Sequence, residues 1–369
     1  MADAIRSLIG HCRFALARRQ LDAAFDIPAH GITGLFGPSG GGKTTLLRCI
    51  AGLEPEARGR LEIGGETWQD DARGIRVPTA QRAIGYVFQE GRLFPHLTVE
   101  HNLLYGWRRN HGARAAVSRE QAIELLGLDA LLQRKPHQLS GGEKQRVAIG
   151  RALLRAPRLI LMDEPLANLD IVRKQEILPF LDRLHAALAL PMLYVSHSLE
   201  EITRLCDHLV VIESGRAAAA GELNQVLTHV NVAVLRGEEA SSVLLGRVQD
   251  FEQRFELTRV AYSGGVIFAV GHHGRPGAAV RLRILARDVS LCRTRPSDST
   301  ILNVLPATIE AVDAAGAHSI VRLRVGRDAL LAKITRHSAE MLGLAAGQSL
   351  YAQIKGVAVK NLPQMEPQS

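Results

Sequence analysis

Gly-Pro-Ser-Gly-Gly-Gly-Lys-Thr, residues 37–44, matches the phosphate-loop pattern G-x-x-x-x-G-K-[ST] at every fixed position. The apolar run 31–36 before it predicts a buried strand, and residues 45–51 after it predict a helix. Glycines let successive backbone N–H groups surround phosphate oxygens, and the N-terminus of the helix adds positive potential. A chance glycine-rich turn would need neither flanking element. We therefore expect a phosphate-binding loop.

The residue types in this loop suggest separate roles for its members. Lys43 should reach the β- and γ-phosphates of a nucleotide, and the Thr44 hydroxyl should bind Mg²⁺. The nucleotide-binding residues expected here are Gly37, Pro38, Ser39, Gly40, Gly41, Gly42, Lys43, Thr44 and Thr45.

A second apolar run, residues 159–162, ends in the acidic pair Asp163-Glu164. A lone strand that ends on two acids is often only solvated, but the phosphate loop upstream favours a catalytic reading. Asp163 is then placed to join the Mg²⁺ shell. Glu164 is the expected general base, which polarises the water that attacks the γ-phosphate.

Gln89 and His197 each follow a short apolar run, 86–88 and 194–196. Ligands gather at the carboxyl ends of parallel strands, so both side chains could reach a nucleotide. Gln89 could contact water or Mg²⁺, and His197 could hydrogen-bond a γ-phosphate. Taken singly, each is more often a surface or core residue.

Residues 139–146, Leu-Ser-Gly-Gly-Glu-Lys-Gln-Arg, predict the start of a helix. Ser140 is a good N-cap, and Glu143 lies three residues later, which is the capping-box spacing. Gly141 and Gly142 leave backbone N–H groups open to a close ligand. The octet alone is equally compatible with an ordinary capped helix.

Up to about residue 225, apolar runs alternate with helical periodicity, which predicts an α/β domain with a largely parallel sheet. Three more strands are expected at 158–162, 192–196 and 209–213. Between 89 and 140 the pattern is helical, most clearly at 119–126, which indicates a helical insertion.

After about residue 228 the pattern changes to short alternating runs with glycine-rich turns, which favours a small β-barrel or sandwich. The clearest strands are expected at 280–284, 319–325 and 350–354, with turns at 263–265 and 314–316. We expect a nucleotide domain at 1–230 with its helical subdomain at about 90–155, a linker and β accessory region at 231–296, and a β domain at 297–365.

Composition narrows the class of protein. The chain has 369 residues, 46% hydrophobic and 22% charged, which suits a soluble protein of two or three domains. No apolar run approaches the roughly 20 residues that span a bilayer, and the N-terminus lacks the apolar core of a signal peptide. We expect a cytoplasmic protein linked to a membrane only through a partner.

The net charge of +8 is spread along the chain, so nucleic acid is not an expected partner. The four scattered cysteines, Cys12, Cys49, Cys206 and Cys292, favour buried or indifferent thiols over a metal site or disulfides.

About the first 225 residues resemble an ATP-binding cassette ATPase. The motifs that carry the resemblance are, in order, the phosphate loop, Gln89, residues 139–146, Asp163-Glu164, Asn168-Leu169-Asp170 and His197. The resemblance implies ATP and Mg²⁺ as ligands, with Thr44, Gln89 and Asp163 around the metal.

The same resemblance implies how two copies of the chain work together. They would form a head-to-tail dimer in which Ser140, Gly141 and Gly142 of one subunit close on the ATP held by the other. Asp170 would act across the dimer, His197 would sense the γ-phosphate, and Gln89 would begin the segment that contacts a membrane permease. One departure concerns adenine, which the family usually stacks on an aromatic side chain upstream of the phosphate loop. Residues 15–20 contain no aromatic, and the nearby Phe14 and Phe25 could belong to the core.

The C-terminal third adds a second resemblance. Residues 299–305 and 350–355 resemble the small β-barrel repeats that bind oxyanions in molybdate-handling proteins, and 281–291 resembles the regulatory domain of molybdate-importer ATPases. Within the cassette, 91–97 and 191–198 are similar to the same ATPases. This implies an ATPase subunit, peripheral on the cytoplasmic face of the inner membrane. It would power molybdate import with a permease and, indirectly, an extracytoplasmic molybdate-binding protein.

The residues themselves support an anion site here only in part. Ser299, Thr300 and Asn303 offer neutral donors and Lys355 one charge, which could hold a tetrahedral dianion. A polar strand end beside a solvated lysine is an equal alternative, and Leu302 stands where the family's barrel often carries arginine.

Two other functions remain open. The cargo could be tungstate, sulfate or thiosulfate, iron or a polyamine, because the ATPase does not touch cargo in the translocation path. A soluble cassette ATPase of DNA repair or translation is disfavoured by the single phosphate loop and by the absence of sustained heptads or an aromatic–basic platform.

Overall fold

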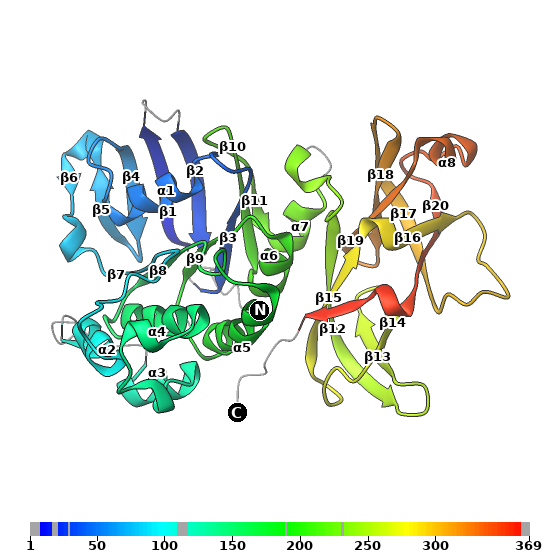
Figure 1. Ribbon diagram of the computed structural model, residues 1–369. Helices are drawn as coiled ribbons and strands as arrows, with labels where there is room; N and C mark the ends of the chain where they lie inside the picture. Colours follow the sequence, from blue (N-terminus) through cyan, green and yellow to red (C-terminus); the bar gives the residue numbers. More distant parts are fainter. Residues whose placement is uncertain are drawn as a thin grey trace, which may run out of the picture. The chain divides into compact units, whose positions relative to one another are not determined.

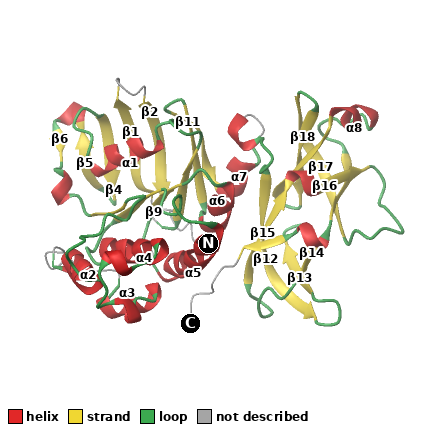
Figure 2. Ribbon diagram, in the orientation of Figure 1, coloured by secondary structure: helices red, strands yellow, loops and turns green. Residues whose placement is uncertain are grey.

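The computed structural model describes residues 8–16, 21–28, 30–108, 117–188, 190–229 and 232–362. The chain divides into two compact units at residues 220 and 221 (Figure 1). The first unit mixes helices and strands, and the second consists mostly of strands (Figure 2).

The first unit contains two sheets and six α-helices among its described residues. Its strands are β1 (Leu8–Leu16), β2 (Leu21–Pro28), β3 (Ile32–Phe36), β4 (Arg58–Ile63), β5 (Glu66–Asp70), β6 (Ile75–Arg76), β7 (Ile84–Val87), β8 (Leu159–Asp163), β9 (Met192–Val195), β10 (His208–Glu213) and β11 (Arg216–Glu222). Its helices are α1 (Lys43–Ala51), α2 (Val99–Trp107), α3 (Arg119–Leu126), α4 (Gly141–Leu153), α5 (Ile171–Ala187) and α6 (Leu199–Leu205).

The larger sheet has the order β11-β10-β3-β9-β8-β7, and its strands from β10 to β7 pair in parallel. This confirms the predicted parallel sheet, including strands at all four predicted positions. In its register, Asp163 of β8 and Leu35 of β3 both pair with Val195 of β9. The carboxyl ends of these three strands therefore lie at one edge of the sheet, and the loops that follow them meet there.

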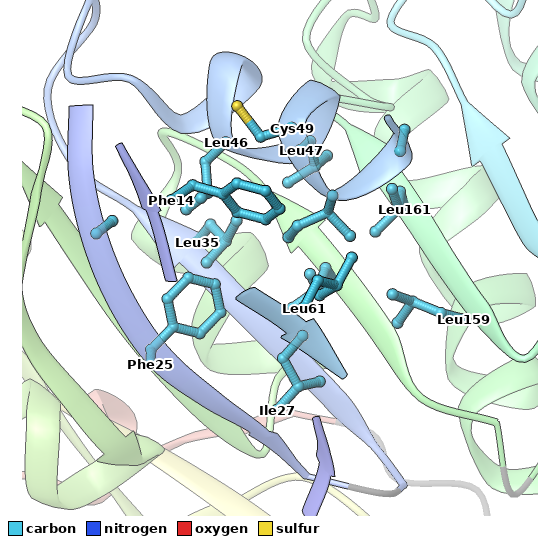
Figure 3. Close-up of a cluster of buried hydrophobic side chains, with 14 of the residues drawn as sticks. Phe14, Phe25, Ile27, Leu35, Leu46, Leu47, Cys49, Leu61, Leu159 and Leu161 are labelled. Atoms are coloured by element: carbon cyan, nitrogen blue, oxygen red, sulfur yellow. The ribbon is translucent and has the colours of Figure 1, made fainter. Parts of the chain in front are cut away.

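A second sheet of the first unit, β2-β1-β4-β5-β6, is antiparallel and was not predicted from the sequence. One apolar cluster joins this sheet, α1 and the parallel sheet. Figure 3 shows its members from all three layers pointing toward one another. Phe14 and Phe25 belong to this cluster and are 0% and 4% exposed. Their burial makes them core residues, with no aromatic face open to adenine.

Helices α2, α3 and α4 form the predicted helical insertion and lie beside one another (Figure 1). The predicted helix at 119–126 matches α3 at both ends, because Ser118 and Gln121 form a capping box at its start and Gly127 ends it in a left-handed conformation.

Among its described residues, the second unit contains α7 (Leu223–Leu227), α8 (Arg336–Met341) and ten strands. The strands are β12 (Ser241–Glu252), β13 (Leu257–Tyr262), β14 (Gly265–Val270), β15 (Ala279–Leu285), β16 (Val289–Cys292), β17 (Asn303–Ala315), β18 (His318–Val325), β19 (Asp328–Thr335), β20 (Ser349–Ile354) and β21 (Lys360–Leu362). The turn at 263–265 lies where it was predicted. The next one begins later than expected, because β17 continues through Ala315.

These strands form two antiparallel sheets, β14-β13-β12-β15-β21 and β16-β20-β17-β18-β19, which share one apolar core. The expected boundary at 296/297 falls between β16 and β17, and both of these strands pair with β20. The strand β21, near the end of the chain, returns to pair with β15. The accessory region and the last segment are therefore interleaved in the two sheets.

Candidate functional site

The phosphate loop connects the buried strand β3 to α1. Its tip, residues 38–40, is exposed, whereas Gly37 and Lys43 are buried. Gly37 has φ +150, and a Cβ placed there would collide with the carbonyl oxygen of Ile212. The loop can therefore follow this path against β10 only with glycine at position 37.

The N-terminus of α1 has the features of an anion site. Its N-cap is Gly42, no side chain caps it, and its first turn holds no acidic residue. The first N–H groups of a helix have no partner within the helix, so they are available to phosphate oxygens. The donor set of residues 37–45 thus fits the nucleotide that the sequence predicts.

Lys43 is 5% exposed, and its Nζ donates to the carbonyl oxygens of Gly37 (2.8 Å) and Pro38 (2.9 Å). Burial lowers the pKa of Lys43, while the negative charges of Glu164 and Asp163 raise it. An ammonium group has three N–H donors, and the two carbonyls use two of them. The charge is thus held inside the loop, facing the acidic end of β8.

Thr44 and Asp163 meet at the edge of the sheet, where the Thr44 hydroxyl donates to Asp163 Oδ1 (2.8 Å). The other carboxylate oxygen accepts from the Tyr86 hydroxyl (3.1 Å). A hydroxyl beside a carboxylate suits Mg²⁺, which takes few protein ligands and completes its shell with water and phosphate. Among the described residues, no group of three His, Cys, Asp or Glu side chains could hold a metal by itself.

Glu164 lies one residue beyond β8 in the left-handed backbone region, with φ +46. Its backbone N–H donates to the carbonyl of Val195 (3.1 Å), which ties this turn to β9. Its carboxylate is 3.3 Å from Nδ1 of His197, which is 54% exposed. Strained backbone of this kind, in a non-glycine residue, persists where surrounding contacts enforce it and is concentrated at functional sites.

Gln89 is exposed, and its amide donates to Asn168 Oδ1 at 3.4 Å. The expected approach of Gln89 to the metal residues is not among the contacts in this structure. Its amide instead faces the turn that leads to Asp170. Asp170 caps α5 by accepting from the N–H of Arg173 (2.9 Å), and its side chain is 60% exposed.

The start of α4 has the predicted capping box. The N–H of Glu143 donates to Ser140 Oγ (3.2 Å), and the N–H of Ser140 donates to Glu143 Oε2 (2.7 Å). A Cβ at Gly141 would lie 2.8 Å from a methyl group of Leu169, so glycine allows α4 to approach the turn before Asp170. Ser140 and Asp170 thus belong to adjacent parts of one subunit.

The four oxyanion candidates of the second unit lie at the start of β17 and the end of β20, where Asn303 pairs with Ile354, the residue before Lys355. Asn303 is 1% exposed, and its amide accepts from the Phe268 N–H (2.7 Å) and donates to the Phe268 carbonyl (2.9 Å). The amide of Asn303 thus joins β17 to β14, and its expected role as a donor to an anion stays a prediction. Ser299 and Thr300 are exposed in the loop before β17, and Lys355 is exposed after β20.

Some relevant residues were not singled out from the sequence. Tyr86 was considered only as part of an apolar run, and Glu201, which accepts a hydrogen bond from Ser196 next to His197, was not considered. A tyrosine in a short buried strand is a weak sequence signal, and an acidic residue in the first turn of α6 is normally read as a helix-dipole partner. For adenine, residues 17–20 lie outside the described part of the chain.

Comparison with known families defines the class. Residues 21–167 match the ABC transporter family, and residues 299–360 match the TOBE domain family. The solved structure of cbiO1 from Clostridium perfringens, part of the ABC transporter complex cbiONQ, shares the fold, with a TM-score of 0.51 and 23% identity over 61% of this chain and 92% of that chain. The fold and site define an ATP-binding cassette ATPase of the P-loop class, followed by an all-β domain.

Relatives that match nearly the full length identify the group within this class. The chain is 50% identical to Molybdenum import ATP-binding protein ModC 1 of Azotobacter vinelandii, over 97% of this chain and 99% of that protein. It is 51% identical to Molybdenum import ATP-binding protein ModC of Thiobacillus denitrificans, over 92% of this chain and 94% of that protein. The chain belongs to the family of molybdenum import ATP-binding proteins, and as a member it binds and hydrolyses ATP.

Proposed function

We propose that this chain is the ATPase subunit of an importer that couples ATP hydrolysis to molybdate uptake through a membrane permease. The names of the full-length relatives support this cargo, and the TOBE match supports a regulatory domain of the expected type. No described helix is long and apolar enough to cross a membrane. The proposal places the chain on the cytoplasmic face of the inner membrane, held there by the permease.

The single observation that supports ATP hydrolysis by this chain is that three loops meet at one edge of the parallel sheet. These loops bring Lys43, the Asp163-Glu164 pair and His197 together. In the proposed reaction, Lys43 and the N–H groups at the start of α1 bind the β- and γ-phosphates. Glu164 then polarises the attacking water. His197, whose Nδ1 is 3.3 Å from the Glu164 carboxylate, contacts the γ-phosphate.

Mg²⁺ would be held by Thr44 and Asp163, whose oxygens are already 2.8 Å apart. When bound, the ion neutralises charge on the β- and γ-phosphate oxygens. Tyr86 keeps the Asp163 carboxylate oriented by donating to its second oxygen. Gln89, expected as a further ligand of water or metal, would have to leave Asn168 to reach the site.

The ATP site is proposed to be shared between two copies of the chain. Ser140, Gly141 and Gly142 of one copy would close on the ATP held by the phosphate loop of the other, with Asp170 acting across the dimer. The capping box already fixes the start of α4, and the exposed side chain of Asp170 is free of the core. Gln89 would begin the segment that passes closure to the permease.

Mixing two defective full-length chains tests the shared site. A Ser140→Arg chain is mixed with a Lys43→Ala chain, each impaired in ATP-dependent dimerisation by itself. The mixed dimer keeps one intact site, so we expect recovery of ATP-dependent closure, measured by sedimentation with Glu164→Gln in both chains to slow hydrolysis. Absence of any recovery would contradict the shared site without affecting ATP binding by the single chain.

Uptake by cells that lack this chain tests the cargo. Radiolabelled molybdate, tungstate and sulfate are compared after complementation with the wild-type chain or with Glu164→Gln. We expect only the wild type to restore molybdate uptake, with sulfate uptake unchanged in all strains. Restoration of sulfate uptake instead would assign the chain to a different importer of the same class.

A further inference from the structure

Glu201 in the first turn of α6 is a buried carboxylate with no assigned role. Glu201 as a whole is 5% exposed. One carboxylate oxygen, Oε2, accepts from the hydroxyls of Tyr194 (2.9 Å) and Ser196 (2.8 Å), and the other, Oε1, accepts from Lys174 Nζ (2.9 Å). Burial of a carboxylate is costly unless it is paired and hydrogen-bonded, and this carboxylate has both a cation and two hydroxyl donors.

These bonds hold the residues on both sides of His197. Ser196 Oγ donates to Glu201 and also accepts from the N–H of Ser198 (3.0 Å). The hydroxyl of Ser198 in turn accepts from the N–H of Glu201 (3.3 Å). His197 thus stands between Ser196, which is bonded to the carboxylate of Glu201, and Ser198, which is bonded to Ser196 and to the backbone N–H of Glu201. The ring of His197 is itself exposed and 3.3 Å from Glu164.

The third partner of Glu201 connects this loop to another part of the site. Lys174 lies in the first turns of α5, whose N-cap is Asp170. The turn before Asp170 contacts Gln89 through Asn168 and α4 through Leu169. Glu201 therefore connects the His197 loop, through its hydrogen bond with Ser196, to α5, through its ion pair with Lys174.

We propose that Glu201 is a positioning residue for ATP hydrolysis, which holds His197 in register with Glu164 through Ser196 and joins the His197 loop to α5 through Lys174. This inference rests on the proposed role of His197. A glutamine cannot reproduce the contacts, because its carbonyl can accept from the hydroxyls only if its NH₂ group faces the ammonium of Lys174, where two donors oppose each other. Burial and the negative charge of Glu201 both raise the pKa of Tyr194, which keeps its hydroxyl protonated as a donor.

The alternative is that Glu201 only helps α6 to pack on α5, and the chain offers a matched control. Arg204, three residues later on α6, donates to Asp182 of α5 at 2.7 Å, and both side chains are similarly buried. Asp182→Asn therefore disrupts a second buried ion pair between the same two helices. A purely structural role for Glu201 predicts the same kinetic consequence for both variants.

The experiment compares Glu201→Gln and Asp182→Asn in the purified full-length chain, by steady-state ATP hydrolysis, fluorescent-nucleotide binding and thermal unfolding. We expect Glu201→Gln to lower kcat by about tenfold or more with KM for ATP changed by less than about twofold, which is the pattern of a contact used only in the transition state. Asp182→Asn should keep kcat within about twofold even where it lowers Tm by a similar amount. Equal losses of kcat in both variants would contradict the proposal.

A double-mutant cycle with His197→Ala separates this inference from the proposed function. If Glu201 acts through His197, Glu201→Gln should lower kcat by less than about twofold further in the His197→Ala chain. An undiminished effect in that background would overturn the proposal. If His197→Ala alone left kcat unchanged, the proposed role of His197 would be wrong. If His197→Ala lowered kcat and Glu201→Gln did not, only the inference on Glu201 would be wrong.

Ser196→Ala provides a second route if Glu201→Gln does not fold. It deletes one hydroxyl, which joins Glu201 to the N–H of Ser198, and keeps the Glu201–Lys174 pair. We expect the same direction of change, a lower kcat with an unchanged KM. Wild-type turnover in a folded Ser196→Ala chain would contradict the positioning route through Ser196.

Discussion

The two units place their candidate anion-binding residues in opposite ways. In the first unit, side chains from the ends of different strands meet, and the buried charge of Lys43 faces the acidic end of β8. In the second unit, the buried candidate Asn303 is bonded to the backbone of a neighbouring strand, and the other candidates are exposed. Both buried side chains bond to backbone, so backbone bonding does not separate them; Lys43 differs because the carboxylates of Asp163 and Glu164 also face it.

The largest expected effect is at the acidic end of β8. Glu164→Gln removes the proposed base but keeps the size of the side chain, so turnover should fall by roughly 10²–10⁴-fold. ATP binding should remain, since Lys43 and the start of α1 are unchanged. Steady-state hydrolysis and nucleotide binding check this, with the exposed Glu200→Gln as the control variant. Wild-type turnover in Glu164→Gln would contradict the proposed role of Glu164 and, with it, the catalytic function assigned to this edge of the first unit.

The phosphate loop offers a matched pair of glycines. Gly37→Ala would place a methyl group against the carbonyl of Ile212, so the loop must shift, and we expect ATP affinity to fall by about tenfold or more (about 1.4 kcal/mol). Alanine is strained by the positive φ at both positions, but a Cβ at Gly40 would meet nothing within 4 Å, so Gly40→Ala should lower ATP affinity by less than Gly37→Ala. Nucleotide titration of both variants measures the difference. Equal affinities would show that the contact of Gly37 with β10 does not shape the loop.

Asn303→Ala tests the structural assignment in the second unit. The substitution leaves the N–H and carbonyl of Phe268 without their side-chain partner, so unfolding free energy should fall by roughly 1–3 kcal/mol. ATP turnover should stay unchanged. Urea unfolding measures the first effect, with the exposed Ser299→Ala as control. Undiminished stability, together with lost molybdate binding by the full chain, would contradict the structural assignment and support Asn303 as a ligand.

The capping boxes at the starts of α3 and α4 give the smallest and most specific comparison. Ser140→Ala and Ser118→Ala each remove an N-cap hydroxyl of the same geometry, and each should cost about 1 kcal/mol of stability. Only Ser140 is proposed to reach the ATP of a second copy. Thermal unfolding should therefore show similar losses, while ATP-dependent dimerisation should weaken only in Ser140→Ala. Equal dimerisation in both variants would reduce residues 139–146 to an ordinary capped helix.

Local patterns were enough to predict much of the cassette. The phosphate loop, the acidic strand end and the capping box at Ser140 each depend on residues close together in the chain, whose geometry is set by backbone conformation and first-turn hydrogen bonds. The parallel strands were predictable for a similar reason, because strands buried on both faces read as continuous apolar runs. The antiparallel sheet was missed because strands such as β5 and β6 are short and because residues far apart in the chain pair there.

Sequence alone predicted the class of the protein, which the comparisons confirm, and a set of nucleotide-binding residues, which stays a prediction; both depend on motifs that are short and whose chemistry is local. Tertiary structure decided which polar residues face one another. It bonded Tyr86 to Asp163 and Glu201 to Ser196, the residue before His197. It also buried Phe14 in the core and used Asn303 to join two strands. Each of these contacts depends on the packing of elements that are distant in the chain, and side-chain hydrogen bonds form only where that packing brings donor and acceptor within about 3 Å.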